Sequence, residues 1–530
     1  MIQTQMGQVN MQPNTAAEDS GIVNKPLWQA CEYFRQQTNV SDYRIYPLTL
    51  LFIKYISDIW QQRCDFYTQS YNGQSGRDEQ QQLIDELLKN ERFVVPAKAN
   101  FEELYQRRFE PGNGERIDLA LELIEDANKE KLSGNGQAVF QHISFNSNDL
   151  GSQVQKNITL RMLLEVFNKP FTNVNLDTPD IERMYAGLYQ SMLEKFAAND
   201  NRDFPEILQT STLSNLFSEL MEPQAGESIC DPFCGTATLL LSCADYIEQN
   251  SGSRQYALYG QESLYNHWSM AKMNLLIHAK DNHKIVFGDT FLCPGLLNDN
   301  DGLQLFDVAI SCLPLRSGNW GLENAKRDRY GRFQRGLPPA NKGSFASIQH
   351  MIETLKPPST NDAGGRMAVL VPQGVLFRGA GEARIRQKLI EENLLEAVIG
   401  MPDKLFHHSS NATAILIFRR QKLDSKVLFI DANQETHDSQ SHNLLTKTLS
   451  QKIVHCYKKR KTKNRFAYIA TSEEIHTNEF NLTISRYVSR NFDEKPIDLN
   501  SLNRQRETLK SKISKLDREI TGYLKAHGIE

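Results

Sequence analysis

Apolar positions in the first 200 residues recur at intervals of three and four, which is the spacing of one face of an α-helix. The pattern predicts helices over Leu27–Gln37, Tyr46–Tyr71, Leu83–Leu88, Ile117–Ile124 and Leu160–Phe167. We therefore expect residues 25–200 to form a helical domain, preceded by a polar leader of residues 1–24 that we expect to be disordered. Nothing in this spacing indicates a catalytic or ligand-binding site, so the helical domain is interpreted as a packing module.

From Ser214 onward the pattern changes to short apolar runs that alternate with amphipathic stretches such as Thr236–Tyr246 and Trp268–His278. The predicted strands are Glu227–Cys230, Tyr256–Tyr259, Lys284–Phe287, Phe306–Ser311, Met367–Val371, Leu395–Ile399, Ala412–Phe418 and Val427–Ile430. Such alternation is typical of a doubly wound α/β sheet. The sequence thus predicts an α/β domain over residues 201–470.

The last segment, residues 471–530, is predicted to be helical. Near its end, Leu509, Ile513, Leu516, Ile520 and Tyr523 recur at intervals of four and three, with charged residues between them. This is a short heptad seam. Two alternatives remain open from the sequence: the helix packs on its own domain, or it pairs with a helix of a partner.

Composition limits the classes of protein that fit this organisation. The chain has 530 residues, of which 40% are hydrophobic and 23% charged, as in ordinary globular proteins of two or three domains. A formal net charge of −4 argues against a protein that coats nucleic acid indiscriminately. Any DNA binding is therefore expected to be confined to a local basic surface.

The eight cysteines contain no C-x-x-C pair. We interpret them as thiols of a reducing, cytoplasmic compartment and predict no metal site. The N-terminus lacks the pattern of a signal peptide, and no run reaches about 18 apolar residues. The sequence therefore predicts a cytoplasmic protein that is not inserted in a membrane.

Polar residues follow three successive predicted strands. Asp231 and Gly235 lie in the turn between a strand and a helix, where backbone N–H groups can face a polar ligand. Glu262 follows the next strand and can accept hydrogen bonds from ribose hydroxyls, and Asp289 follows the third and can accept from an adenine amine. Each acid alone could equally be a helix cap or a solvated loop residue, but together they favour a cofactor crevice.

At this point the chain resembles the modification (M) subunit of type I restriction-modification systems, which are adenine-N6 DNA methyltransferases. The resemblance rests on ordered motifs, notably Asp231–Leu239, Tyr259–Glu262, Val371–Gly379, Leu395–Pro402 and Phe480–Val488. It implies an N-terminal helical domain, a Rossmann-like methyltransferase domain and C-terminal helices. It further implies S-adenosylmethionine as cofactor, DNA as substrate, and contact of the C-terminal helices with a specificity (S) subunit. A restriction subunit and a second M-type subunit are further implied partners.

The resemblance assigns ten positions to the cofactor, and some of them depart from the family pattern. They are Gln209, Thr210, Ser211, Asp231, Gly235, Thr236, Ala237, Thr238, Glu262 and Asp289. Gln209-Thr210-Ser211 stand where the family has Thr-Pro-Arg, and Thr238 replaces a glycine where the backbone approaches closely. We therefore expect S-adenosylmethionine to bind, with weakened affinity.

The catalytic motif departs further from the family pattern than the cofactor positions do. The family places Asn-Pro-Pro-aromatic after the fourth strand, where Asn and a proline carbonyl accept from the target amine and the aromatic ring stacks on the flipped base. Here Cys312, Leu313, Pro314 and Leu315 occupy these positions. A thiol is a weak acceptor and leucine has no π face, so we expect methylation to be very slow or nil. A role of Cys312 as a cytosine-C5 nucleophile is disfavoured, because that chemistry uses a Cys that follows Pro-Pro.

Two function classes therefore remain open: an adenine-N6 methyltransferase that is slow or restored by a partner, and a non-catalytic paralogue that scaffolds DNA and a specificity subunit. A cationic stretch with interleaved aromatic residues borders the site and is the predicted DNA contact, although a solvated loop is the alternative. Its cations are Lys326, Arg327, Arg329, Arg332 and Arg335. A second cluster, Lys458 to Arg465, reads as a flexible surface connection.

Overall fold

The structure is a computed structural model that describes most of the chain. The described residues are 25–40, 42–71, 77–134, 136–168, 178–199, 210–313, 318–360, 362–403, 405–406, 411–433, 445–463, 465–488 and 499–526. The predicted leader at residues 1–24 lies outside them, as do Gln209, Pro314 and Leu315.

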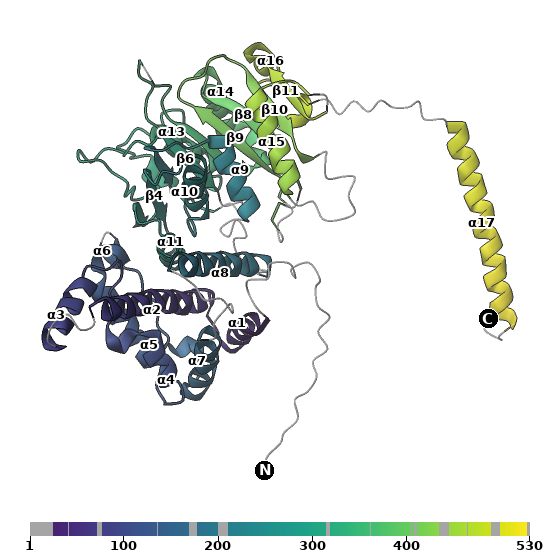
Figure 1. Ribbon diagram of the computed structural model, residues 1–530. Coiled ribbons are helices and arrows are strands. Elements are labelled where there is room, and N and C mark those ends of the chain that lie inside the picture. The colour runs from purple at the N-terminus through teal and green to yellow at the C-terminus, as the bar shows by residue number, and fades with distance from the viewer. Residues whose placement is uncertain are drawn as a thin grey trace.

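Among its described residues, the N-terminal lobe, which we call the helical lobe, contains eight α-helices (Figure 1). They are α1 (Lys25–Gln37), α2 (Ile45–Ser70), α3 (Arg77–Leu88), α4 (Phe101–Gln106), α5 (Asn113–Ala127), α6 (Lys129–Leu132), α7 (Gln153–Phe167) and α8 (Thr178–Asn199). Helix α2 is buried along most of its length and contacts α7 and α8. A two-residue hairpin, β1 (Ser133–Gly134) with β2 (Gln137–Ala138), completes the lobe.

A nine-stranded sheet forms the second lobe, which we call the sheet lobe. Its order is β11-β10-β8-β9-β7-β6-β3-β4-β5, and it is parallel except for β9 and β11. The strands are β3 (Ser228–Asp231), β4 (Ala257–Glu262), β5 (His283–Phe287), β6 (Val308–Cys312), β7 (Arg366–Pro372), β8 (Leu395–Gly400), β9 (Thr413–Arg419), β10 (Val427–Asp431) and β11 (Ala467–Ala470). All eight predicted strands are confirmed.

Helices cover both faces of this sheet. Alternate residues of each strand point to opposite sides, and here the residues on both sides are apolar and buried. Ile310, Leu370 and Ile415 pack into one core, and Ala309, Val369 and Leu416 pack into the other. The helices of the first face are α9 (Ser211–Met221), α10 (Thr238–Ser251), α11 (Tyr265–Ile277) and α15 (Lys447–Lys459); those of the second are α13 (Ser344–Glu353) and α14 (Ala380–Glu391). The predicted doubly wound α/β fold is confirmed. Short helices α12 (Leu322–Ala325) and α16 (Ser472–Thr477) lie in connections.

The order of the strands creates a switch point beside β3. The chain runs from β3 to β4 and β5 on one side and then returns to β6 on the other side. Beyond the carboxyl ends of strands that diverge in this way, an α/β sheet opens a ligand crevice. Asp231 ends β3 and Cys312 ends the adjacent β6, so both stand at the edge of the sheet where such a crevice is expected.

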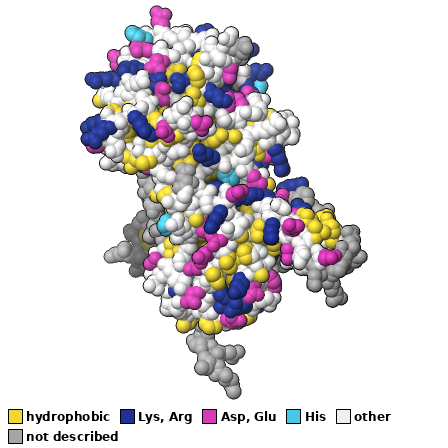
Figure 2. All heavy atoms as spheres, turned by 90° about the vertical axis from the view of Figure 1, so that its left-hand side faces the viewer, with side chains coloured by type: hydrophobic (Ala, Val, Ile, Leu, Met, Phe, Trp, Pro, Cys, Tyr) yellow, Lys and Arg dark blue, Asp and Glu magenta, His cyan; other side chains and the backbone are white. Residues whose placement is uncertain are grey.

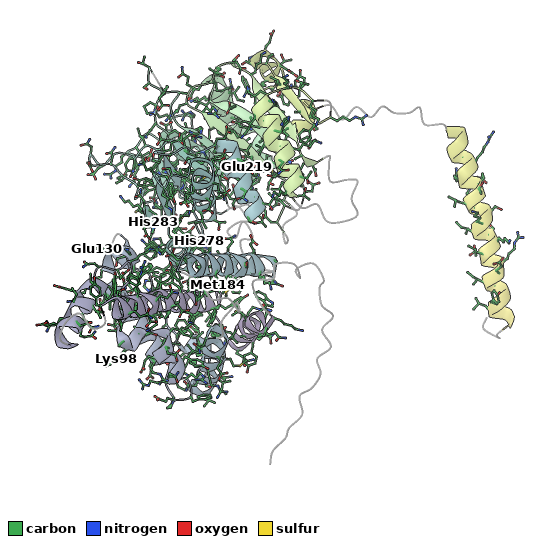
Figure 3. The ribbon with its side chains drawn as sticks, viewed as in Figure 1. Lys98, Glu130, Met184, Glu219, His278 and His283 are labelled. Atoms are coloured by element: carbon green, nitrogen blue, oxygen red, sulfur yellow. The ribbon has the colours of Figure 1, made fainter. Side chains whose placement is uncertain are left out.

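The helical lobe packs against α11 of the sheet lobe. The Tyr189 hydroxyl donates to the Met270 carbonyl at 3.1 Å, and the Ser269 hydroxyl donates to the Val139 carbonyl at 2.7 Å. Arg92 donates to the Leu276 carbonyl at 2.6 Å. Figure 3 shows His278 and His283 of the sheet lobe above Met184 of α8, where the two lobes meet.

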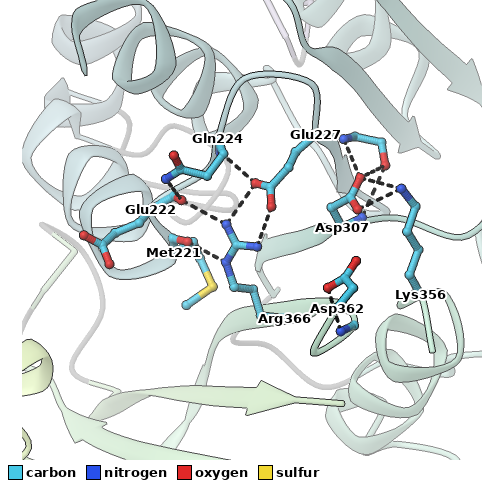
Figure 4. A network of polar contacts seen from close by, with 10 residues as sticks. Met221, Glu222, Gln224, Glu227, Asp307, Lys356, Asp362 and Arg366 are labelled. Atoms are coloured by element: carbon cyan, nitrogen blue, oxygen red, sulfur yellow. Dashed lines mark hydrogen bonds and ion pairs between the residues drawn. The ribbon is translucent and has the colours of Figure 1, made fainter. Parts of the chain in front are cut away.

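Ion pairs close the amino-terminal edge of the sheet, opposite the crevice (Figure 4). Arg366, at the start of β7, forms a two-pronged pair with Glu227 before β3, at 2.8 and 2.9 Å, and also donates to the Met221 carbonyl. Asp307 accepts from Ser228 and from Lys356, with the ammonium at 2.7 Å. These bonds tie β3 to β6 and β7 at the end of the sheet away from the predicted cofactor.

Helix α17 (Leu499–Ala526) lies apart from both lobes in Figure 1. Its predicted seam is exposed, and Leu509, Ile513, Leu516, Ile520 and Tyr523 each keep more than half of their surface open to solvent. Of the two alternatives for this helix, the structure does not show packing on its own domain. Among the described residues, every helix is too short or too polar to cross a bilayer.

Candidate active site

Two left-handed residues shape the turn that follows β3. Gly235 has φ +53° and Ala237 has φ +61°. Glycine adopts this conformation without strain, whereas alanine in it costs energy through its Cβ. Ala237 is the N-cap of α10, so the turn brings the first turn of α10 to the carboxyl edge of the sheet. Exposed helix N–H groups at such an edge attract polar or anionic ligand groups.

Glu262 at the end of β4 is joined to this turn. Its Oε2 accepts a hydrogen bond from the Gly235 amide at 2.9 Å, and its Oε1 accepts from the Leu264 amide at 2.8 Å. A carboxylate offers about four acceptor positions, so it retains capacity for a further donor. The backbone of its own lobe thus fixes the orientation of Glu262.

Asp231 is almost fully buried at the end of β3. Burial, with a smaller contribution from the nearby Glu262, raises the pKa of its carboxyl group to about 7, although the hydrogen bonds of the Phe233 amide and Ser311 oppose the shift. Its Oδ1 accepts from the Phe233 amide at 3.0 Å. The charge of this carboxyl group therefore changes near neutral pH.

Asp289 lies after β5, at the start of a tight loop. Its Oδ1 accepts from the amides of Phe291 at 2.7 Å and Leu292 at 3.0 Å, and Oδ2 accepts no hydrogen bond from any described residue. One oxygen therefore stabilises the conformation of the loop, and the other can accept a hydrogen bond from a ligand.

At the end of β6 the structure buries the first two residues of the altered motif. Cys312 is 4% exposed and Leu313 is 1% exposed. The Leu313 amide donates to the Leu370 carbonyl at 3.2 Å, and its side chain packs in the core with Phe345 and Val375. Leu313 thus extends the pairing of β6 with β7 into the position that the family gives to a proline.

The predicted residues before α9 and in the first turn of α10 have local partners. Thr210 is the N-cap of α9, and its hydroxyl accepts from the Leu213 amide at 3.4 Å. The Ser211 amide donates to Glu194 at 3.2 Å. Thr236 and Thr238 are buried with their hydroxyls 3.0 Å apart, so the added side chain of Thr238 finds a partner inside the turn.

Two features beside the crevice were not expected from the sequence. Asn274 of α11 donates to the Thr236 carbonyl at 2.8 Å, while its own Oδ1 is buried without a hydrogen bond. Phe233, Phe291 and Trp320 form a chain of ring contacts with centroids 5.3 and 5.4 Å apart. The motif Asp231-Pro232-Phe233 could have indicated the first ring, but no local signal indicates the partner of Asn274.

The predicted DNA-contact residues divide into two groups. Lys326, Arg327 and Arg329 are exposed. Arg332 is 3% exposed and Arg335 is 8% exposed. Arg332 forms a buried ion pair with Asp328, whereas Arg335 pairs with the partly buried Glu353 and the exposed Glu392. The prediction that all five cations face DNA is corrected here, because two of the side chains point into the protein.

Arg335 anchors the far end of the β6–α13 segment, by which we mean residues 318–343. It pairs with Glu353 at the end of α13 at 2.7 Å and with Glu392 after α14 at 2.6 Å. Arg332 instead bonds to the loop that carries Asp289. The segment is therefore held at two separate points.

Comparisons with known proteins identify the family to which this chain belongs. The family model described as N-6 DNA Methylase matches residues 182–495, and that of the HsdM N-terminal domain matches residues 23–167. The type I restriction enzyme MpnII methylase subunit of Mycoplasma pneumoniae is 22% identical over 95% of this chain and 96% of its own length. The HindI methylase subunit of Haemophilus influenzae is 28% identical over 71% of this chain and 83% of its own.

Among solved structures, the type I restriction-modification system methyltransferase subunit from Streptococcus thermophilus has the same fold. It superposes with a TM-score of 0.72 at 24% identity, over 88% of this chain and 98% of that one. The shared architecture therefore extends over both the helical and the sheet lobes.

Proposed function

The chain belongs to the N-6 DNA methylase family, and on that premise we propose that it is an M-type subunit that binds S-adenosylmethionine and DNA but methylates adenine very slowly or not at all. The observation that carries the proposal is the end of β6, where buried Cys312 and Leu313 take the first two positions of the altered motif. The family relationship supports the cofactor and the reaction class, and the altered motif supports the loss of rate.

The donor and acceptor chemistry of the crevice fits the nucleoside half of the cofactor. Ribose hydroxyls and the adenine amine are donors, and Glu262 and Asp289 are acceptors with capacity left after their backbone bonds. When bound, S-adenosylmethionine supplies an electrophilic methyl group. The departures at residues 209–211 and at Thr238 support a weakened affinity.

The residues at the end of β6 would have to orient the target amine. Catalysis of this kind depends on acceptors that hold the amine in line with the methyl donor, and such positioning contributes several kcal/mol, roughly 10²-fold or more for one oriented contact. The Cys312 thiol is a weak acceptor, and a leucine at 315 offers an extruded base no stacking surface. An adenine would therefore enter the site without the contacts that offset the cost of base flipping.

The DNA contact that we propose consists of Lys326, Arg327 and Arg329, which are exposed in the β6–α13 segment. Phosphate contacts by such cations position DNA without reading its sequence. We further propose that the exposed seam of α17 pairs with helices of a specificity subunit, which would supply sequence recognition. A restriction subunit and a second M-type subunit are the remaining proposed partners, and the complex would act in the cytoplasm.

The domain boundaries that go with this proposal are residues 1–24, 25–200, 201–470 and 471–530. The second boundary falls between α8, which ends at Asn199, and α9, which begins at Ser211. The third falls just after β11, which ends at Ala470.

Calorimetry with S-adenosylmethionine tests the cofactor part of this proposal. We expect measurable heat with a dissociation constant in the micromolar range or weaker, and Glu262→Gln should reduce the affinity because the amide accepts through only one oxygen. Lys326→Gln serves as the control, since it changes a charge that lies on the proposed DNA surface. Absence of heat for the native chain at high micromolar ligand would remove the cofactor claim.

The second candidate function is a non-catalytic scaffold that pairs with an active copy. The burial of Leu313 favours it, because this side chain packs in the core and its amide is engaged with β7. A DNA-methylation assay distinguishes the two candidates, since slow but measurable formation of N6-methyladenine by this chain and its specificity subunit would exclude the scaffold.

A further inference from the structure

Arg332 donates hydrogen bonds from all three nitrogens of its guanidinium group. Its Nε donates to Asp328 at 2.8 Å, and its two terminal nitrogens donate to the carbonyls of Thr290 at 2.9 Å and Phe291 at 3.0 Å. One of these nitrogens also lies 3.4 Å from Nδ1 of His350 on α13. The guanidinium therefore joins the β6–α13 segment to the loop after β5 and to α13.

The two carbonyls that it holds belong to residues directly after Asp289. The Asp289 carboxylate in turn accepts from the amides of Phe291 and Leu292, so the loop is fixed from both sides of its backbone. The Thr290 hydroxyl donates to the Pro232 carbonyl at 2.6 Å, which links this loop to the turn after β3. A substitution of Arg332 would therefore change the conformation of the loop that carries Asp289.

The charge of the buried Arg332 is balanced by one carboxylate, that of Asp328, and its neighbour His350 is neutral. Asp328 also accepts from the Arg332 amide at 2.6 Å, and both side chains are almost fully buried. His350 faces the guanidinium and is neutral, because burial and the charge of Arg332 lower its pKa to about 3. A buried arginine whose three nitrogens all donate hydrogen bonds holds a defined geometry, whereas its loss would leave Asp328 buried without its counter-charge.

We propose that Arg332 is a positioning residue for the adenine end of the cofactor, acting by holding the Asp289 loop in the orientation that accepts from the adenine amine. The inference rests on the proposed binding of S-adenosylmethionine. It replaces the role of DNA contact that the cationic composition of the segment suggested. The planar fork of arginine reaches several acceptors at once, which the single ammonium of lysine does not.

The test compares Arg332→Lys with Arg335→Lys. Both residues are buried arginines of the same segment with carboxylate partners, but Arg335 bonds to Glu353 and Glu392 and not to the Asp289 loop. Calorimetry measures the affinities for S-adenosylhomocysteine and for S-inosylhomocysteine, which carries a carbonyl in place of the adenine amine. Neither ligand requires the chain to be catalytically active.

We expect the native chain and Arg335→Lys to prefer the adenosyl ligand by about tenfold, the value of one well-placed hydrogen bond to a charged group. In Arg332→Lys this preference should fall to near unity. A native preference in folded Arg332→Lys would overturn the role of Arg332 while leaving cofactor binding intact. Failure of the native chain to bind either ligand would overturn the cofactor site itself, and with it this proposal.

Should Arg332→Lys not fold, Asp328→Asn provides the second variant. It keeps the shape of the partner side chain and one oxygen for Arg332 but removes the charge. We expect a smaller reduction of the adenosyl preference, with an unchanged thermal transition for the control Glu323→Gln on the exposed face. An unchanged preference in folded Asp328→Asn would contradict the proposal.

Discussion

At the scale of single residues, Asp231 is expected to give the fold a distinctive pH dependence. Its pKa is raised to about 7 in the native state, against about 3.9 in an unfolded chain. The native state therefore keeps a proton that the unfolded chain releases, and the contribution of Asp231 to the unfolding free energy falls between about pH 4 and 7, by up to about 4 kcal/mol.

Asp231→Asn should abolish this contribution, because asparagine stays neutral and keeps an oxygen for the Phe233 amide. Relative to the native chain, the variant should gain stability as the pH rises from 5 to 8. Urea unfolding at the two pH values measures the difference, in which the other titrating groups cancel. A difference that does not vary with pH would show that Asp231 is not protonated in the fold.

Ala237 offers a second residue-scale prediction. Left-handed backbone costs an alanine roughly 1–2 kcal/mol, and glycine avoids this at an entropic cost of about 0.5–1 kcal/mol. Ala237→Gly should therefore raise the unfolding free energy slightly, by about 0.5 kcal/mol or more. Ala244→Gly inside α10 is the control and should lower it by about 1 kcal/mol or more. Thermal and urea unfolding measure both variants. A lower unfolding free energy for Ala237→Gly would show that the left-handed backbone at Ala237 is not strained.

The sequence allowed some of these residues to be placed and not others. Asp231, Glu262 and Asp289 could be placed at one edge because parallel strands end together, and the structure brings them there. The buried state of Arg332 could not be foreseen, since its main acceptors are backbone carbonyls from another loop. Composition alone does not tell which cations in a basic stretch point inward.

At the scale of elements, the pair of Arg366 with Glu227 should stabilise the sheet without affecting the crevice. Arg366→Lys loses the two-pronged geometry and the bonds to backbone carbonyls, and should lower the unfolding free energy by about 1–3 kcal/mol. Urea unfolding measures this loss, and calorimetry should show unchanged cofactor affinity. The control Arg254→Lys alters an exposed arginine and should have almost no effect. A strong loss of cofactor affinity in Arg366→Lys would contradict the separation of the two edges.

The sequence located the strands of the sheet better than the ends of the helices. Predicted Leu160–Phe167 is the second half of α7, which begins at Gln153 because Ser152 and Gln155 form a capping box. Predicted Ile117–Ile124 lies likewise inside α5. Apolar spacing identifies the buried face of a helix. A polar first turn contains few apolar residues, so the spacing does not show where the helix begins. The short edge strand β11 and helix α8 were not predicted, although the buried Tyr185, Leu188, Met192 and Phe196 of α8 recur at intervals of three and four.

At the scale of the whole molecule, α17 is the proposed connection to a specificity subunit. Ile513→Asp with Leu516→Asp places charges on the exposed seam and should abolish co-purification with the specificity subunit. Cofactor affinity should not change, since the helix lies apart from the crevice. Ser514→Asp is the matched control, because this exposed position lies off the seam. Full co-purification of the double variant would exclude this surface.

We propose a methyltransferase-like subunit in which Cys312, Leu313 and Leu315 no longer supply the contacts that hold an adenine. The most direct test uses the chain purified from a host without adenine methylation, together with its specificity subunit, S-adenosylmethionine and cognate DNA. Mass spectrometry of the digested DNA measures N6-methyladenine. We predict background levels for the native chain and measurable product for a variant with Cys312→Asn, Leu313→Pro and Leu315→Phe combined. Robust product from the native chain would contradict the account.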